Sequence, residues 1–132
     1  MHPNSNLTHY IYKSKLNSYG FRDAEYDLEP TKDTIRIAIV GDSFTFGYGL
    51  ENQEDTYVKQ LEKILNANSR QKYEVLNFGT SGANILDVYW LLKYKILEFN
   101  PDIVIYGFFP NDLEFHQNNL DINFCLNYKY VN

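Results

Sequence analysis

Three positions in this chain carry residue types that acyl transfer requires. Ser43 offers a hydroxyl that could act as a nucleophile, Gly82 a backbone N–H open to close approach, and Asn111 a side-chain amide. A serine nucleophile needs a base and fixed hydrogen-bond donors where negative charge develops on the tetrahedral intermediate. The N–H of Ser43 is a further candidate donor. Losing one such donor typically costs about 3–4 kcal/mol of transition-state stabilisation.

Each candidate follows an apolar segment that predicts a buried strand. These segments are residues 35–40, 73–78 and 103–109, and their near-continuous apolar character is typical of a parallel sheet. Residues 55–67 and 85–99 carry apolar side chains at helical spacing. The β-α-β-α-β series predicts an α/β fold with right-handed crossovers. We therefore expect the candidates at the carboxyl edge of the sheet, where open α/β folds bind ligands.

The segment after the first strand has other possible interpretations. Ser43 could cap a helix instead of reacting, and Asp42 is expected to fix the turn rather than to catalyse. A phosphate-binding loop is not favoured, because no Lys-Ser/Thr pair follows the glycines. The Gly-x-Ser-x-Gly nucleophile elbow is not matched either, because Thr45 stands where the last glycine would be.

Composition excludes several classes of protein. The 132 residues fit one domain, and 44% hydrophobic with 22% charged residues is typical of a soluble globular protein. A net charge of −5 without a basic patch disfavours a nucleic-acid partner. No apolar run is long enough to cross a bilayer. We find no export signal at the amino terminus, so the default location is cytoplasmic.

No metal site is expected from the residues. Cys125 is the single cysteine, and the three histidines show no ligand spacing. The 12 tyrosines and 9 phenylalanines suggest an aromatic binding surface, but an AT-rich gene explains them more simply. Trp90, at a helical position, is expected in the core rather than as a platform for substrate.

Four segments together resemble the SGNH/GDSL hydrolases. Residues 41–44 (Gly-Asp-Ser-Phe), 77–82 (Asn-Phe-Gly-Thr-Ser-Gly) and 111–112 (Asn-Asp) are similar to the first three sequence blocks of that family, in the same order. Residues 17–22 are similar to an Asn-x-x-Gly-Phe-Arg segment that precedes the first strand in a bacterial branch. The resemblance covers roughly residues 17–115.

The resemblance implies a flavodoxin-like three-layer αβα sandwich with sheet order 2-1-3-4-5, of which 2-1-3 falls within this chain. It implies hydrolysis of an ester of a lipid, a glycan or a small molecule, without a metal or organic cofactor. Carried over to this sequence, Ser43 is the nucleophile. Its own N–H, the N–H of Gly82 and the side chain of Asn111 form the oxyanion hole.

Two departures from the family pattern bear on activity. Phe109 occupies the position, two residues before Asn111, where the family usually has glycine. The family's catalytic base lies in a late Asp-x-x-His block that this chain does not contain, and His116 is expected to be a loop or surface residue. Three functions therefore stay open: a hydrolase completed outside this chain, a non-catalytic binding remnant, and a flavodoxin-like cofactor binder.

The same reasoning divides the chain and predicts a behaviour in solution. Residues 1–34, which lack a sustained period, are expected to form a loop-rich extension, and residues 35–132 a partial hydrolase-type domain that is incomplete at its carboxyl end. In the order 2-1-3 the third strand lacks an outer neighbour. An open apolar edge of this kind predicts self-association.

Overall fold

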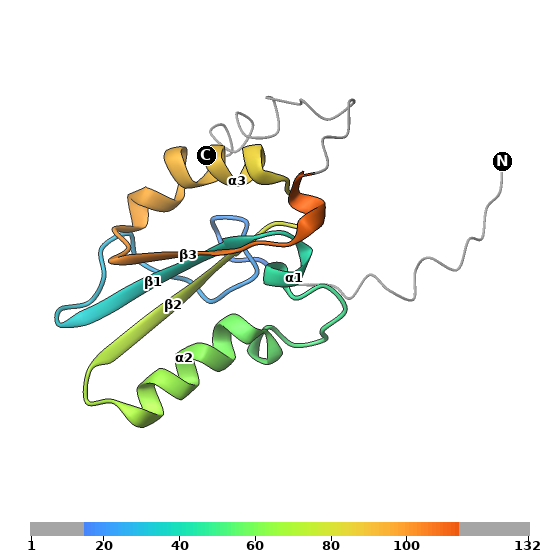
Figure 1. Cartoon of the computed structure of the whole chain (residues 1–132). Coiled ribbons are helices and arrows are strands. Elements are labelled where there is room, and N and C mark those ends of the chain that lie inside the picture. Colours follow the sequence, from blue (N-terminus) through green and yellow to red (C-terminus); the bar gives the residue numbers. More distant parts are fainter. Residues whose placement is uncertain (1–14, 114–132) are drawn as a thin grey trace, which may run out of the picture.

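Three parallel strands form one sheet in the order β2-β1-β3 (Figure 1). In this computed structural model, which describes residues 15–113, the strands are β1 (Thr34–Gly41), β2 (Lys72–Gly79) and β3 (Ile103–Gly107). The predicted parallel α/β sheet and its order are confirmed. β3 ends two residues earlier than predicted, because the N–H of Phe109 donates to the Asp112 carboxylate and the chain turns.

Helices cover both faces of this sheet, which gives three layers. Helix α2 (Tyr57–Asn68) lies on one face, and α3 (Ile85–Tyr94) with the 3₁₀ helix η3 (Ile96–Phe99) lies on the other (Figure 1). The predicted helix 85–99 is thus two helices, separated at Lys95, whose backbone leaves the helical region. None of the helices within the described residues is long and apolar enough to span a membrane.

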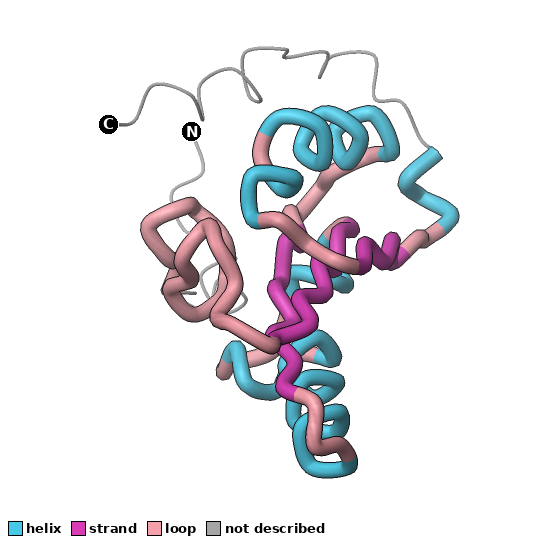
Figure 2. The backbone as a smooth tube through the Cα atoms, turned by 90° about the vertical axis from the view of Figure 1, so that its left-hand side faces the viewer, coloured by secondary structure: helices cyan, strands magenta, loops and turns pink. Residues whose placement is uncertain are grey.

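Short helical turns complete the described chain. They are α1 (Ser43–Phe46), η2 (Gln53–Asp55) and η4 (Pro110–Leu113). Figure 2 shows the sheet between its two helical layers, with an irregular loop segment beside it. Both α1 and η4 directly follow strand ends, so the turns that carry candidate residues are positioned by the sheet.

Alternate residues of β1 belong to two separate hydrophobic clusters. Ala38 and Val40 face the α3 layer, whereas Ile37 and Ile39 face α2, as the two-residue period of a strand requires. Two predictions about core residues are wrong. Ile64, expected on the buried face of α2, is 58% exposed, and Trp90 of α3 is 39% exposed.

Residues 15–33 pack against the sheet although they form no helix or strand. Phe21 lies in the hydrophobic cluster on the α3 side, with its ring edge-on to Phe78 at 4.7 Å between centroids. The buried guanidinium of Arg22 donates to the carbonyls of Gly47 and Leu50, both at 2.6 Å. This segment therefore holds the loop that follows α1. The division of the chain at residue 34 stays a prediction.

Candidate active site

The turn after β1 is fixed by Asp42, which caps α1. Its buried carboxylate accepts a hydrogen bond from the N–H of Phe44 at 2.9 Å. Asp42 thus has the structural role predicted for it, and the capping residue is Asp42 rather than Ser43. Ser43 is the first residue of α1 and is half-buried. Within residues 15–113 no hydrogen bond occupies its hydroxyl, and its N–H is one that a helix start leaves without an intrahelical acceptor.

A row of glycines lets α1 lie directly on the strand ends. Gly41, Gly79 and Gly107 are the last residues of β1, β2 and β3, and they are register partners across the sheet. A Cβ at Gly79 would overlap the backbone of Thr45 and Phe46 in α1. A Cβ at Gly107 would lie 2.7 Å from the Thr45 hydroxyl. The predictions from sequence do not include this row, although a glycine lies within two residues of the end of each predicted strand.

The loop that carries Gly82 is tied to the end of β1. The N–H of Thr80 donates to the carbonyl of Gly41 at 2.9 Å, and the N–H of Ala83 donates to Thr80 at 3.1 Å to close the turn. Gly82 is exposed and has a φ of +79°, which side chains rarely adopt. Apart from its two chain neighbours, no atom of residues 15–113 lies within 4 Å of where its Cβ would be. The space beside Gly82 is therefore open to a ligand.

A buried carboxylate anchors the loop that carries Asn111. Asp112, with no exposed surface, accepts from the Tyr106 hydroxyl at 2.7 Å and from the N–H of Phe109 at 3.1 Å. Burial, and then the nearby Asp112 carboxylate, raises the pKa of Tyr106 well above its usual value, which keeps this phenol protonated as a donor. Asn111 itself is exposed.

Phe109, which departs from the family pattern, joins this loop to α1. Its ring lies 4.5 Å from that of Phe44, centroid to centroid. The end of β1 is therefore tied to the loop after β2 through Thr80, and α1 contacts the loop after β3 through Phe109. In this way the sheet brings the loops of Ser43, Gly82 and Asn111 to one edge.

Two buried carboxylate oxygens near this edge lack a described donor, Oδ2 of Asp42 and Oδ1 of Asp112. Within the described residues no group of three His, Cys, Asp or Glu side chains could hold a metal ion. His116 and Cys125 lie outside those residues.

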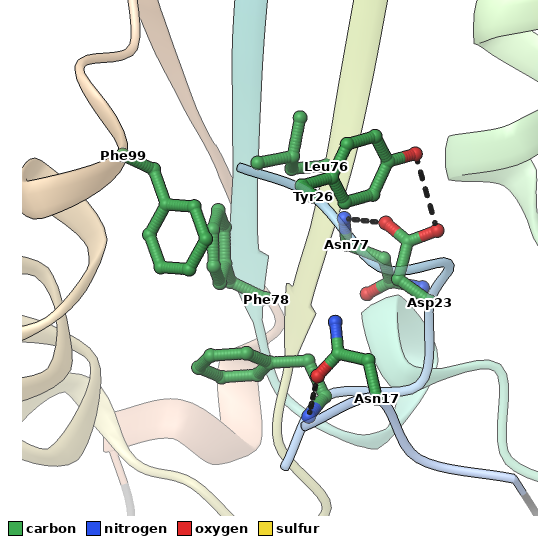
Figure 3. Close-up of a pocket in the computed structure, with 8 residues that line it drawn as sticks. Asn17, Asp23, Tyr26, Leu76, Asn77, Phe78 and Phe99 are labelled. Atoms are coloured by element: carbon green, nitrogen blue, oxygen red, sulfur yellow. Dashed lines mark hydrogen bonds between the residues drawn. The ribbon is translucent and has the colours of Figure 1, made fainter. Parts of the chain in front are cut away.

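A crevice elsewhere in the domain belongs to the core. It lies where residues 15–33 meet β2, and Figure 3 shows aromatic rings and the side chains of Asn17, Asp23 and Asn77 lining it. Asp23 accepts from the backbone N–H of Asn77 at 2.7 Å, and Phe78 packs edge-on against Phe99 with 5.2 Å between centroids. These contacts attach the amino-terminal segment to the carboxyl-terminal half of β2.

Comparison with known proteins relates this chain to one curated protein and to one protein family. It is 34% identical over 90 residues to an acetylxylan esterase of Xylanibacter ruminicola, an alignment that covers 63% of this chain and 18% of that protein. No solved structure matches significantly. Residues 39–126 match the model of the GDSL-like lipase/acylhydrolase family. The chain therefore belongs to the GDSL-like lipase/acylhydrolase family.

Proposed function

We propose that this chain carries the nucleophile and the oxyanion hole of a serine esterase. Ser43 is the nucleophile, and the donors are its own N–H, the N–H of Gly82 and the side-chain amide of Asn111. The observation that carries the proposal is that the end of β1 and α1 meet the loops after β2 and β3 at one sheet edge, through the Thr80–Gly41 hydrogen bond and the Phe44–Phe109 contact.

In the proposed reaction the Ser43 oxygen attacks the ester carbonyl carbon and its proton passes to a base. The carbonyl oxygen becomes an oxyanion that accepts from the three donors. The intermediate then collapses to an acyl-serine, and the leaving alcohol takes the proton. Water next attacks the acyl-serine with the help of the same base, which releases the acid and regenerates the hydroxyl.

In this family the catalytic base comes from an Asp-x-x-His block, and these 132 residues contain no such block. A serine hydroxyl without a base is a poor nucleophile at neutral pH. We expect the 132-residue chain to turn over esters slowly unless a base is added. The competing proposal is a binding remnant, which would hold an ester without cleaving it.

For the substrate we propose an acetyl ester on a polysaccharide of the xylan type. The support is the name of the relative, acetylxylan esterase, together with the identity of 34%. Because the alignment spans only 18% of that protein, the substrate has to be tested on this chain itself.

Chemical rescue tests this function. Acetate release from acetylated xylo-oligosaccharides is measured for the 132-residue chain with increasing imidazole, which replaces the missing base. We expect release above the imidazole background for the wild type and for Ser81→Ala, a control in an exposed position of the neighbouring loop. Ser43→Ala should show the background only. Rescue that survives in Ser43→Ala would refute the nucleophile, and saturable binding without rescue would favour the remnant.

We also propose that the chain self-associates through β3. Its residues Ile103, Val104 and Ile105 are 39–45% exposed although they are apolar. Within the described residues β3 pairs only with β1, so its outer edge presents unpaired backbone groups.

A further inference from the structure

The outer surface of α3 carries a cluster of exposed aromatic side chains. Tyr89, Trp90 and Tyr94 are 49%, 39% and 52% exposed. The rings of Trp90 and Tyr94 are stacked, with 5.4 Å between centroids and 10° between planes, and Tyr89 meets Trp90 edge-on at 5.1 Å. The Lys93 ammonium lies 5.2–5.8 Å from all three ring centroids. We call these four residues the α3 aromatic face.

The hydrophobic core does not need this cluster. The other side of α3 already packs on the sheet through Val88, which is buried, and through Leu91 and Leu92. Within residues 15–113, aromatic rings on the α3 face contact chiefly one another and Lys93. Contiguous exposed apolar surface of this kind typically marks an interaction site.

We infer that the α3 aromatic face binds the sugar chain of the polysaccharide whose acetyl esters are the proposed substrate. This inference rests on the proposed function. A pyranose ring presents an apolar face of C–H groups that can lie on the electron-rich face of an exposed aromatic ring. The sugar hydroxyls can meanwhile bind the Lys93 ammonium and the phenol groups of Tyr89 and Tyr94. An uncharged ligand that is apolar on one side and polar at its rim fits this combination.

The position of the helix supports the same ligand. Asn84 caps the start of α3 with its side chain, two residues after Gly82. At about 1.5 Å per residue, Trp90 lies roughly 8 Å along the axis from the first residue of the helix. A polymeric substrate that lies along α3 can therefore extend toward the loop of Gly82, which a small isolated ester could not do. This continuity favours a polymer over a second protein chain as the occupant.

Tryptophan fluorescence tests the inference directly, because Trp90 is the single tryptophan of the chain. Titration with xylohexaose, which carries no ester, should change the Trp90 emission saturably. Tyr94→Ala should weaken binding roughly two- to tenfold through the loss of one aromatic contact. Ile64→Ala on α2, an exposed apolar residue of the opposite layer, should bind like the wild type. Calorimetry on the same variants provides a readout that does not depend on the indole.

The outcomes separate this inference from the proposed esterase. Binding of xylohexaose by Ser43→Ala with wild-type affinity supports the α3 face whether or not imidazole rescue succeeds. If imidazole rescues acetate release but xylohexaose gives neither a change in Trp90 emission nor a heat of binding, sugar binding by the α3 aromatic face is refuted and the esterase proposal stands. An emission change that follows protein concentration instead of sugar also overturns it, since a second copy would then cover the face.

Discussion

The two flanks of β1 differ in burial although both are apolar strands. On the β2 side, Val75, Leu76 and Phe78 are at most 2% exposed, whereas Val104 and Ile105 of β3 are 39% and 40% exposed. Both strands pair in parallel with β1. Composition and pairing therefore do not decide burial. The layer that packs over a strand decides it.

Buried charges hold the layer over β2. The Lys59 ammonium on α2 pairs with Asp23 at 3.0 Å and Glu62 at 2.6 Å, and it donates to the carbonyl of Val75 at 2.9 Å. One ammonium thus connects α2, β2 and the amino-terminal segment. The described part of β3 has no equivalent connection.

Removing that ammonium should have the largest effect on stability. Lys59→Met leaves Asp23, whose side chain is 2% exposed, without its positive partner. Loss of one member of a buried pair costs about 3–5 kcal/mol, which urea unfolding can measure. Lys63→Met is the matched control, because its pair with Glu54 is 54% exposed on both sides and should cost less than about 1 kcal/mol. Equal losses in the two variants would contradict the special role of the β2 side.

Alanine substitutions in the glycine row should also destabilise the β2 side more than the β3 side. Gly79→Ala, on β2, forces a Cβ against the backbone of α1 and should cost about 1–3 kcal/mol. Gly107→Ala, on β3, meets the side-chain oxygens of Thr45 and Tyr57 at 2.7 Å and no α1 backbone atom, so it should cost less than Gly79→Ala. Urea unfolding ranks the two, and imidazole-rescued acetate release shows whether α1 has shifted Ser43. A larger loss for Gly107→Ala would reverse the comparison.

The regular part of the fold could be predicted because its causes are local. Runs of β-branched residues and helical spacing determine a parallel sheet, and parallel strands bring their carboxyl ends to one edge. The loops of Ser43, Gly82 and Asn111 therefore follow from pattern alone. The sequence pattern does not determine which N–H groups point at an oxyanion, because this depends on atomic positions. The oxyanion hole therefore stays a prediction.

What the sequence did not reveal depends on contacts between distant residues. Arg22 binds carbonyls more than 20 positions away, in a segment without any period. A core position is predicted for Trp90 because it lies in a helix, but the apolar stripe containing Val88 and Leu92 places it on the other side of α3. Gly41, Gly79 and Gly107 form one row only when the ends of the three strands are aligned in the sheet, which the sequence alone does not show.

Alkaline pH should weaken the contacts that Lys59 makes on the β2 side. Burial alone lowers the pKa of Lys59, but Asp23, Tyr26 and Glu62 together raise it above the ordinary 10.5. A raised pKa in the folded state gives stability that is complete below 10.5 and is lost as pH rises beyond it. The loss approaches about 1.4 kcal/mol per pH unit for this group. Urea midpoints should therefore fall more steeply above pH 10.5 for the wild type than for Lys59→Met, and parallel curves would contradict this.

The smallest effect on stability is expected on β3, together with a clear effect on association. Val104→Lys places a charge on a strand that is already exposed, so the free energy of unfolding should change by less than about 0.5 kcal/mol. A lysine on an edge strand opposes pairing with another chain, so light scattering should show more monomer than for the wild type. Ile39→Lys, at a position of β1 that is 1% exposed, should instead prevent folding. A wild type that is already a monodisperse monomer would refute self-association. If Val104→Lys unfolds the chain as Ile39→Lys does, β3 is covered in solution, and the contrast between the two flanks of β1 does not hold.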